Sequence, residues 1–253
     1  GKTTSTSMLT EVLLNAGYDP SAIIGGKLAS IGGSGRVGNS RYLVCEADEF
    51  RDTFLNIHPE TAVILNVQED HLEYFKNLDN IISSFARFAG QTRKNVVVNM
   101  DDEGARRAVE NCQTPVIKVG IGEDCDYRAL NIIQEGPFAR YDLIRRGEKI
   151  GRIEMSIPGI HQVHNSLCVL AAADSMGVPM DSAIESVCRF GGAGRRFEFL
   201  GKLHGITLAD DYAHNPKEIE VTLQTAKQMG YKRVIAVFQP VTYSRTAMML
   251  KEF

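Results

Sequence analysis

The chain begins with the tripeptide Gly1-Lys2-Thr3, directly ahead of a helical pattern. The tripeptide matches the end of the phosphate-binding motif G-x-x-x-x-G-K-[ST]. In that motif backbone N–H groups cradle phosphates, the lysine reaches the β- and γ-phosphates, and the hydroxyl binds Mg²⁺. The same residues also occur at ordinary helix starts, where a hydroxyl caps the first turn. Taken alone, the tripeptide leaves both a nucleotide site and a plain helix start open.

Acidic residues follow two short apolar runs that have the composition of buried strands. Glu46 comes after the run 42–45, and Asp70-His71 comes after the run 62–67. Because ligands of parallel sheets sit beyond the carboxyl ends of the strands, both groups should face the same edge as a phosphate loop. A carboxylate at Glu46 suits Mg²⁺, and the imidazole of His71 suits a second cation or the γ-phosphate. Each group alone is more typical of a solvated loop or a helix cap. Their joint placement with the tripeptide favours a nucleotide site.

Three later segments carry further candidate binding residues. Asn165 lies at a helix start, and its amide has both the donor and the acceptor needed to bind an adenine edge. Arg196 follows a glycine-rich stretch and has the planar fork that clamps a phosphate. Asp211, between a strand and a helix, suits a ribose diol or an ammonium group. Helix capping and an exposed linker arginine explain the same residues without a ligand.

Short apolar runs alternate with helical patterns in the first half of the chain. Beyond 42–45 and 62–67, the expected strands are 96–98 and 116–119. The expected helices are 3–16, one with an apolar stripe from Ile81 to Ala89, and 103–111. This alternation predicts an α/β fold with a phosphate loop and a doubly wound, mostly parallel sheet.

From residue 127 the pattern changes to an antiparallel meander, with strands expected at 127–134, 138–145 and 149–157. Helices are expected at 161–176 and 181–190. A glycine-rich connection then ends the first unit, so the predicted domains are 1–196 and 197–253. The second unit should hold a hairpin about His204-Gly205, a helix at 216–229, a strand at 234–238 and the start of another helix. These elements are too few to close a sheet, which indicates an incomplete Rossmann-like α/β domain.

The composition is that of an ordinary globular protein, with 43% hydrophobic residues, 23% charged residues and a net charge of −3. The basic residues are not clustered with aromatic residues, which argues against nucleic-acid binding. The apolar run 168–173 is far too short to span a bilayer, so no membrane association is expected. The five cysteines show no metal-ligand spacing, so the pattern predicts neither a zinc site nor a disulfide framework and favours the cytoplasm.

Taken together and in this order, these segments resemble the Mur ligases of bacterial cell-wall synthesis over essentially the whole chain. The motifs that carry the resemblance are Gly1 to Thr4, Cys45 to Glu49, Asn66 to Leu72, Gly159 to Asn165, Gly194 to Glu198, Asp210 to Pro216, Phe238-Gln239-Pro240 and Tyr243 to Thr246. Within the family, the strings Glu-Ala-Asp-Glu, Arg-Arg-Phe-Glu and Asp-Asp-Tyr-Ala-His are similar to those of the branch that adds L-alanine to UDP-N-acetylmuramate.

The resemblance implies a central ATP-binding domain followed by the first part of a C-terminal Rossmann-like domain, with the UDP-sugar domain outside the chain. It implies Lys2, Glu46 and His71 as catalytic residues, and Gly1, Lys2, Thr3 and Thr4 as the loop that holds the ATP phosphates. It implies Thr3 and Glu46 as ligands of one Mg²⁺ and His71 as a ligand of a second. It further implies that Asn165 contacts adenine, Arg196 the phosphates and Asp211 the ribose, and that His214, Tyr243 and Arg245 lie near the amino acid or the closing interface.

Three positions depart from the family pattern. Gln162 replaces the asparagine of the usual His-Asn pair, Asn215 replaces the second histidine of Asp-Asp-Tyr-Ala-His-His-Pro, and Val241 replaces the histidine after Phe-Gln-Pro. The carbamylated lysine that some Mur ligases use is also missing, since the corresponding helix offers Arg87 instead. Related alanine-adding enzymes also lack this lysine, so its absence agrees with that branch.

The expected reaction is an ATP-driven amide synthesis through an acyl phosphate, made from the UDP-sugar carboxylate and displaced by the amino group of L-alanine. Two alternatives are a ligase that joins a whole tripeptide to the UDP-sugar and a folylpolyglutamate synthase. A third is a non-catalytic nucleotide-binding module. Because the chain starts inside a phosphate loop and stops within a second unit, we expect the 253 residues alone to lack ligase activity.

Overall fold

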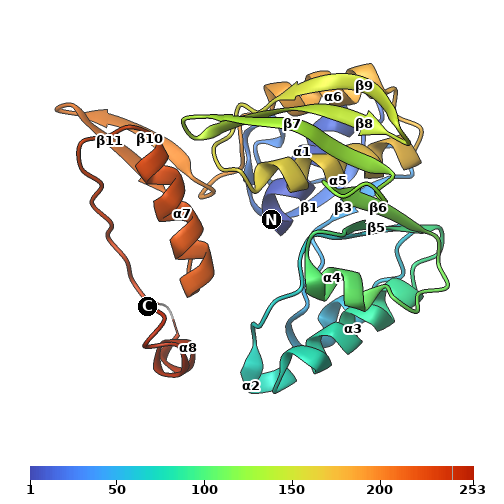
Figure 1. The fold of residues 1–253 in the computed structure, drawn as a ribbon, viewed down its shortest axis with the longest axis horizontal. Coiled ribbons are helices and arrows are strands. Elements are labelled where there is room, and N and C mark those ends of the chain that lie inside the picture. Colours follow the sequence, from blue (N-terminus) through green and yellow to red (C-terminus); the bar gives the residue numbers. More distant parts are fainter. Residues whose placement is uncertain (241) are drawn as a thin grey trace.

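The computed structural model describes residues 1–240 and 242–253, with all their side chains except those of Ser244 and Arg245. Its largest sheet has six strands in the order β4-β5-β6-β7-β8-β9 (Figure 1). Their bounds are Thr61–Ile64, Asn95–Asn99, Val116–Gly120, Tyr127–Glu135, Phe138–Arg145 and Glu148–Glu154. Strands β4 to β7 are parallel, whereas β7, β8 and β9 pair antiparallel. The predicted parallel sheet with an antiparallel meander is therefore confirmed.

Helices cover both faces of this sheet, and β5 shows how the two faces are divided. Val97 belongs to the core that includes the apolar residues of α1 (Lys2–Asn15), α5 (Gln162–Ser175) and α6 (Met180–Arg189). Its neighbours Val96 and Val98 point the other way, into a second core with α3 (Leu78–Gly90) and α4 (Glu103–Ala108). Successive side chains of a strand point to opposite faces, so a run of valines serves both cores. No helix in the described part of the chain is both long and apolar enough to cross a membrane.

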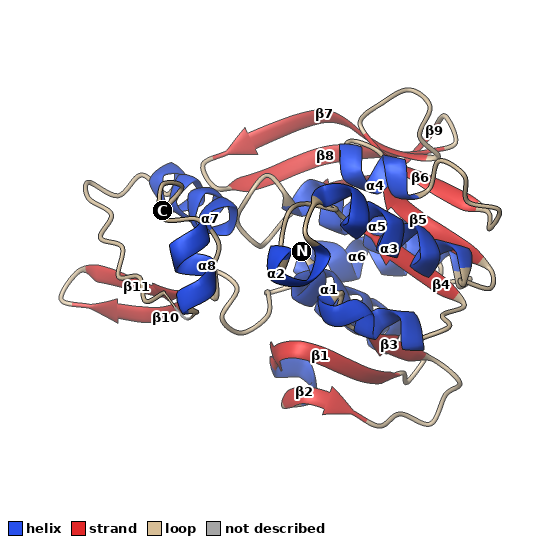
Figure 2. Ribbon diagram, turned by 90° about the horizontal axis from the view of Figure 1, so that it is seen from below, coloured by secondary structure: helices blue, strands red, loops and turns tan. Residues whose placement is uncertain are grey.

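A smaller sheet packs against α1 (Figure 2). It has the order β2-β1-β3, with bounds Gly33–Arg36, Ser21–Leu28 and Leu43–Cys45. Strand β3 runs parallel to β1, and β2 runs antiparallel to it. The expectation that the run 42–45 joins the run 62–67 in one sheet is therefore wrong, and β1 and β2 were not predicted. Both of these strands contain glycines and lack a regular alternation, which hid them.

Short side-chain caps define where several elements begin. Asn77 Oδ1 accepts the Asn80 N–H at 2.9 Å at the start of α3. Asp102 Oδ1 accepts the Ala105 N–H at 2.8 Å and also the Val67 N–H at 3.0 Å. The second contact ties the loop after β4 to the start of α4. The remaining short helical segments are Ala29–Ile31, Phe50–Asn56 and α2 (Leu72–Phe75).

The C-terminal unit, orange to red in Figure 1, begins with a two-stranded antiparallel sheet of β10 (Glu198–Leu203) and β11 (Ile206–Asp210). Helices α7 (Pro216–Gln228) and α8 (Tyr243–Met248) follow. The strand expected at 234–238 is wrong, because residues 232–240 form no strand and Val237 is 96% exposed. A buried strand needs neighbours on its edges, and β10 and β11 pair only with each other.

Candidate active site

The first turn of α1 is shaped to leave backbone N–H groups open. Gly1 occupies the N-cap position and provides no side-chain cap. A Cβ at this position would lie 2.8 Å from Leu65 Cδ1 and 3.3 Å from Asn165 Oδ1, so these two side chains lie close against Gly1. Uncapped N–H groups and the helix dipole together attract anions. The start of α1 therefore has the local structure of a phosphate site. Thr4, the fourth residue of the predicted loop, is buried within this helix.

Thr3 and Glu46 are joined directly. The Thr3 hydroxyl donates to Glu46 Oε1 at 2.9 Å, and Thr3 is only 2% exposed. The second oxygen of Glu46 accepts the backbone N–H of Gly25 at 2.7 Å. A Cβ on Gly25 would come within 2.7 Å of that carboxylate, so a larger residue here would displace the Glu46 side chain. Gly25 was not predicted, since nothing near it in the sequence marks the approach of Glu46.

Arg196 reaches the same corner from the connection that precedes β10. Its Nη2 donates to Thr3 Oγ1 at 2.8 Å. The guanidinium carbon also lies 5.5 Å from the centre of the Tyr212 ring, within the range of a cation–π contact. Thr3, Glu46 and Arg196 are therefore linked by hydrogen bonds. We call these three residues and Lys2 the phosphate corner.

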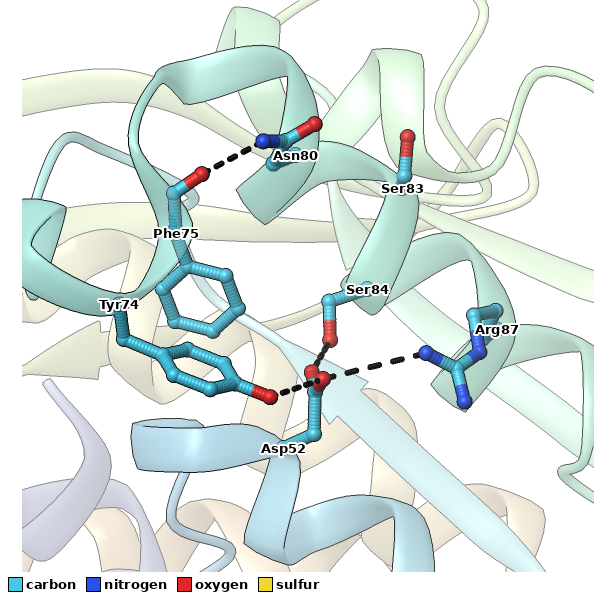
Figure 3. Close-up of a pocket in the computed structure, with 7 residues that line it drawn as sticks. All are labelled: Asp52, Tyr74, Phe75, Asn80, Ser83, Ser84 and Arg87. Atoms are coloured by element: carbon cyan, nitrogen blue, oxygen red, sulfur yellow. Dashed lines mark hydrogen bonds and ion pairs between the residues drawn. The ribbon is translucent and has the colours of Figure 1, made fainter.

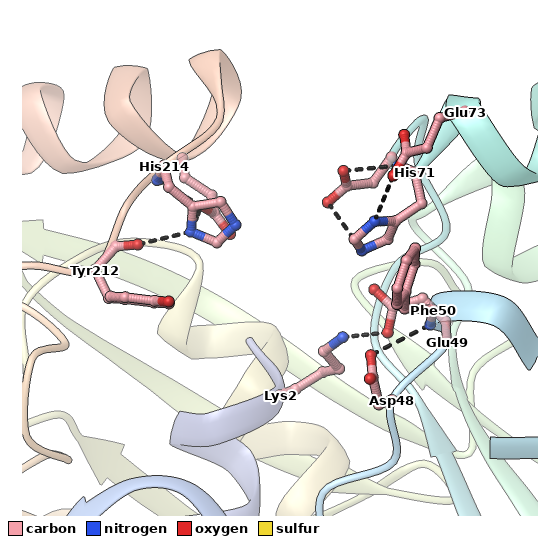
Figure 4. A network of polar contacts seen from close by, with 10 residues as sticks. Lys2, Asp48, Glu49, Phe50, His71, Glu73, Tyr212 and His214 are labelled. Carbon is pink, nitrogen blue, oxygen red and sulfur yellow. Dashed lines mark hydrogen bonds and ion pairs between the residues drawn. The ribbon is translucent and has the colours of Figure 1, made fainter. Parts of the chain in front are cut away.

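Lys2 forms an ion pair with Glu49, three residues beyond Glu46 (Figure 4). The Lys2 side chain is 47% exposed, whereas that of Glu49 is 18% exposed. A cavity of about 280 Å³ lies here and is lined by Lys2, Gly25, Glu46 and Asp48, among others. The lysine thus stands at an open site, held by a counterion that phosphate oxygens can replace.

His71 lies beside this acidic segment because of an aromatic contact. The rings of Phe50 and His71 are 4.7 Å apart between centroids. His71 is in the left-handed region, with φ of 52°, and its Nδ1 lies 3.5 Å from Glu73 Oε1. His71 thus contacts Phe50, in the segment that follows Glu46, although the strands that precede Glu46 and His71 belong to different sheets. Glu49 belongs to the motif Cys45 to Glu49, but its contact with Lys2 was not predicted, and Phe50 was not singled out in the sequence.

Asn165 lies in the first turn of α5, close to the start of α1. It is 5% exposed, and its Nδ2 donates to Gln162 Oε1 at 2.8 Å. The amide oxygen is the atom that faces Gly1. Gln162, one of the departures from the family pattern, therefore fixes the orientation of the predicted adenine contact. In turn its Nε2 lies 3.0 Å from His161 Nε2.

His214 lies on the other side of Lys2 from His71 (Figure 4), and Asp211 precedes it by three residues. Both oxygens of Asp211 accept backbone N–H groups, from Phe197 at 2.8 Å and from Ala213 at 2.7 Å. His214 Nδ1 lies 2.8 Å from the Tyr212 carbonyl, and its backbone N–H donates to Glu218 Oε2 at 3.0 Å. Asp211 thus shapes the turn that carries His214 toward the phosphate corner.

The last predicted residues, Tyr243 and Arg245, belong to α8 of the C-terminal unit (Figure 1). Tyr243 lies in α8, and 97% of it is exposed. The backbone of Arg245 lies in the same helix, but its side chain falls outside the described residues, as does the whole of Val241.

The donor set at the corner fits a hard cation bound together with phosphates. Among the described residues, no group of three or more His, Cys, Asp or Glu side chains forms a metal cluster. Mg²⁺ typically takes one or two protein oxygens and completes its shell with water and substrate phosphates. The Thr3 hydroxyl and the Glu46 carboxylate supply such oxygens. Burial and the adjacent Glu46 raise the pKa of the Cys45 thiol above its ordinary value, so a thiolate does not compete.

Known proteins align with this chain over its whole length. UDP-N-acetylmuramate–L-alanine ligase of Caldanaerobacter subterraneus subsp. tengcongensis is 44% identical over 256 residues, which cover 100% of this chain and 56% of that protein. The ligase of the same name from Clostridium novyi is 42% identical over 255 residues, with the same coverage. The chain therefore spans about half the length of the curated relatives it matches.

Solved structures show the same fold. UDP-N-acetylmuramate-alanine ligase MurC from Thermotoga maritima superposes with a TM-score of 0.82 at 29% identity, covering 100% of this chain and 57% of that one. A murein peptide ligase from Psychrobacter arcticus gives 0.74 at 28% identity, covering 92% of this chain and 54% of that one. The family profile of the Mur ligase middle domain matches residues 1–173, and that of the Mur ligase glutamate ligase domain matches residues 195–253. On these matches, and with the phosphate corner at the start of α1, the chain belongs to the Mur ligase family.

Proposed function

We propose that this chain is the ATP-binding part of an enzyme that joins L-alanine to UDP-N-acetylmuramate, in the cytoplasm, for peptidoglycan synthesis. The observation that carries the proposal is the phosphate corner, where Thr3 contacts both Glu46 and Arg196 next to Lys2. The identity of 44% to a ligase of that name supports L-alanine as the amino acid. Because the chain covers 56% of that relative, the activity of the complete protein, meaning the protein as its gene encodes it, is part of the proposal.

Lys2 and the open N–H groups of α1 bind the ATP phosphates in this scheme. Lys2 leaves Glu49 and pairs with the β- and γ-phosphates, and Arg196, which contacts Thr3, adds a second positive charge. Positioning and charge neutralisation supply most of the rate enhancement in phosphoryl transfer. Asn165 is proposed to contact adenine, and Asp211 the ribose.

Thr3 and Glu46 are proposed to hold one Mg²⁺, and His71 a second. Mg²⁺ bound there neutralises phosphate charge as it develops. Gly25 and Thr3 hold the Glu46 carboxylate in place before any ligand arrives. His214, Tyr243 and Arg245 are proposed to serve the amino acid or the closing interface.

The proposed reaction proceeds in two steps, formation of an acyl phosphate and its displacement by an amine. A carboxylate oxygen of the UDP-sugar attacks the γ-phosphorus of ATP, so that ADP leaves and an acyl phosphate forms. The amino group of L-alanine then attacks the acyl carbon, loses a proton and expels inorganic phosphate. The products are an amide, ADP and phosphate.

A tripeptide-adding ligase is the second candidate, because a murein peptide ligase matches this chain at 28% identity with a TM-score of 0.74. Phosphate release by the complete protein, with ATP and UDP-N-acetylmuramate present, separates the two. We expect release with L-alanine to exceed release with the tripeptide or with glutamate. Faster release with the tripeptide or with glutamate overturns the choice of L-alanine. ATP binding without any turnover points to a non-catalytic module.

A further inference from the structure

A cavity of about 240 Å³ lies outside the phosphate corner (Figure 3). It is open to solvent and is lined by residues of the helical segment Phe50–Asn56 and of helices α2 and α3. Asp52 stands at its centre, with Tyr74, Ser84 and Arg87 around it. None of these four residues has a role in the proposed reaction.

The Asp52 carboxylate gathers contacts from both helices. Its Oδ2 accepts the Tyr74 hydroxyl of α2 at 2.9 Å, and its Oδ1 accepts the Ser84 hydroxyl of α3. Arg87 Nη1, one turn further along α3, lies 3.9 Å from Oδ2. The Asp52 side chain is 25% exposed, so these partners are only partly screened by water. One carboxylate therefore joins three elements.

The backbone at Asp52 needs such support. Arg51 and Asp52 are consecutive residues in the left-handed region, with φ of 52° and 58°. For a residue other than glycine this conformation is strained, and it persists only where surrounding contacts enforce it. The hydrogen bonds of the Asp52 side chain are contacts of this kind.

The turn at 51–52 determines where its preceding residues point. Phe50, directly before the turn, packs its ring on His71, and Glu49 pairs with Lys2. The turn is closed by the Asp52 N–H, which donates to the Glu49 carbonyl at 3.0 Å. On its other side, Phe54 is buried against the rings of Phe85 and Phe88 of α3. A loss of the Asp52 contacts would therefore loosen the segment on the side that faces the phosphate corner.

We propose that Asp52 is a positioning residue of this site. Its carboxylate fixes residues 48–52 against α2 and α3, and through Phe50 it holds His71 in place relative to the phosphate corner. The inference rests on the proposed function, since the reaction is where the positioning acts.

Kinetics of the complete protein test the positioning. Asp52→Ala should lower kcat for alanine-dependent phosphate release about tenfold while KM for ATP changes less than about threefold. Asp79→Ala is the matched control, because Asp79 is likewise an aspartate paired with an arginine. It lies in α3 on the exposed surface, 2.6 Å from Arg107. The control should change neither value more than about twofold.

A double-mutant cycle with Phe50→Leu tests the route of the effect. If Asp52 acts through Phe50, Asp52→Ala should cost less than about twofold in kcat in the Phe50→Leu background. An equal loss in both backgrounds, or an unchanged kcat for Asp52→Ala, overturns the proposal. If Asp52→Ala fails to fold, Tyr74→Phe takes its place in the kinetic measurement and in the double-mutant cycle. Tyr74→Phe removes the hydrogen bond from the Tyr74 hydroxyl to Asp52 and keeps the aromatic ring.

Amide hydrogen exchange separates this inference from the proposed function, because it needs no turnover. In Asp52→Ala the amides of residues 48–54 should exchange about tenfold faster than in the wild type, while those of α5 keep their rates. Unchanged exchange at 48–54 contradicts the positioning role. Faster exchange in a protein whose wild type shows no alanine-dependent turnover supports the role of Asp52 in holding the segment and refutes the assigned reaction.

Discussion

Arg196 and Thr3 stand 193 positions apart in the sequence, yet Arg196 Nη2 donates a hydrogen bond of 2.8 Å to Thr3 Oγ1. Thr3 belongs to the first turn of α1, and Arg196 to the connection that leads into β10. The contact links the start of the C-terminal unit to the corner that we propose binds ATP phosphates. A shift of that connection would therefore move Arg196 relative to Thr3 and to the proposed phosphate site.

Replacing Arg196 with lysine should weaken ATP binding. Lysine keeps the charge but lacks the planar fork that contacts Thr3 Oγ1 and the Tyr212 ring. We expect the Kd for ATP to rise about tenfold, the effect of one lost hydrogen bond to a charged group. Isothermal titration of the complete protein measures the change. Arg189→Lys is the control, since Arg189 is an exposed residue of α6 paired with Glu185. An Arg196→Lys variant that binds ATP as the wild type does contradicts its assignment.

Gly25→Ala should disturb the proposed cation site, although Gly25 is not itself a proposed ligand. The added methyl would meet the Glu46 carboxylate at 2.7 Å and push it away from Thr3. We expect the Mg²⁺ concentration for half-maximal phosphate release to rise about tenfold, as for other residues that orient metal ligands. Gly33→Ala in β2 is the matched control, because a Cβ there has no neighbour within 4 Å. Equal Mg²⁺ requirements in the two variants would argue against Glu46 as a ligand.

Gly104→Ala should lower the free energy of unfolding by about 2 kcal/mol or more, because a Cβ would lie 2.1 Å from the Val67 carbonyl oxygen and the backbone must shift. Gly90→Ala is the control, because Gly90 lies in α3 and a Cβ there would have open space around it. This substitution should raise the free energy of unfolding by about 0.5 kcal/mol. Urea denaturation measures both values. Val67 leads to Asp70-His71, so a Gly104→Ala variant as stable as the control would mean that the loop before His71 moves freely.

Much of the fold could be predicted because hydrophobic periodicity marks it. The helix expected at 3–16 is α1, and the three meander strands agree with β7, β8 and β9 within a few residues. Strands β1 and β2 escaped prediction because glycines interrupt their pattern. The strand expected at 234–238 is wrong for the opposite reason, since its apolar run has no neighbouring strand in the described structure.

Part of the candidate site could be predicted as residues, such as Lys2, Thr3, Glu46 and Arg196, but not as a set of contacts. Strand ends and the start of α1 placed Glu46 and Lys2 near one edge, which is a local rule of parallel sheets. The contact of Phe50 with His71 and the approach of Gly25 to Glu46 depend on how two separate sheets pack around α1. Such long-range packing leaves no periodic signal in the sequence.

We propose that Lys2 binds the ATP phosphates during phosphoryl transfer in an alanine-adding ligase. The most direct test of this proposal is phosphate release by the complete protein with ATP, UDP-N-acetylmuramate and L-alanine, measured for the wild type and for Lys2→Ala. Lys217→Ala is the control, because Lys217 is an exposed lysine of α7 paired with Glu220. We predict phosphate release that depends on L-alanine, falls below about 1% of the wild-type rate in Lys2→Ala and is retained in Lys217→Ala. Near-normal turnover in Lys2→Ala would contradict the proposal.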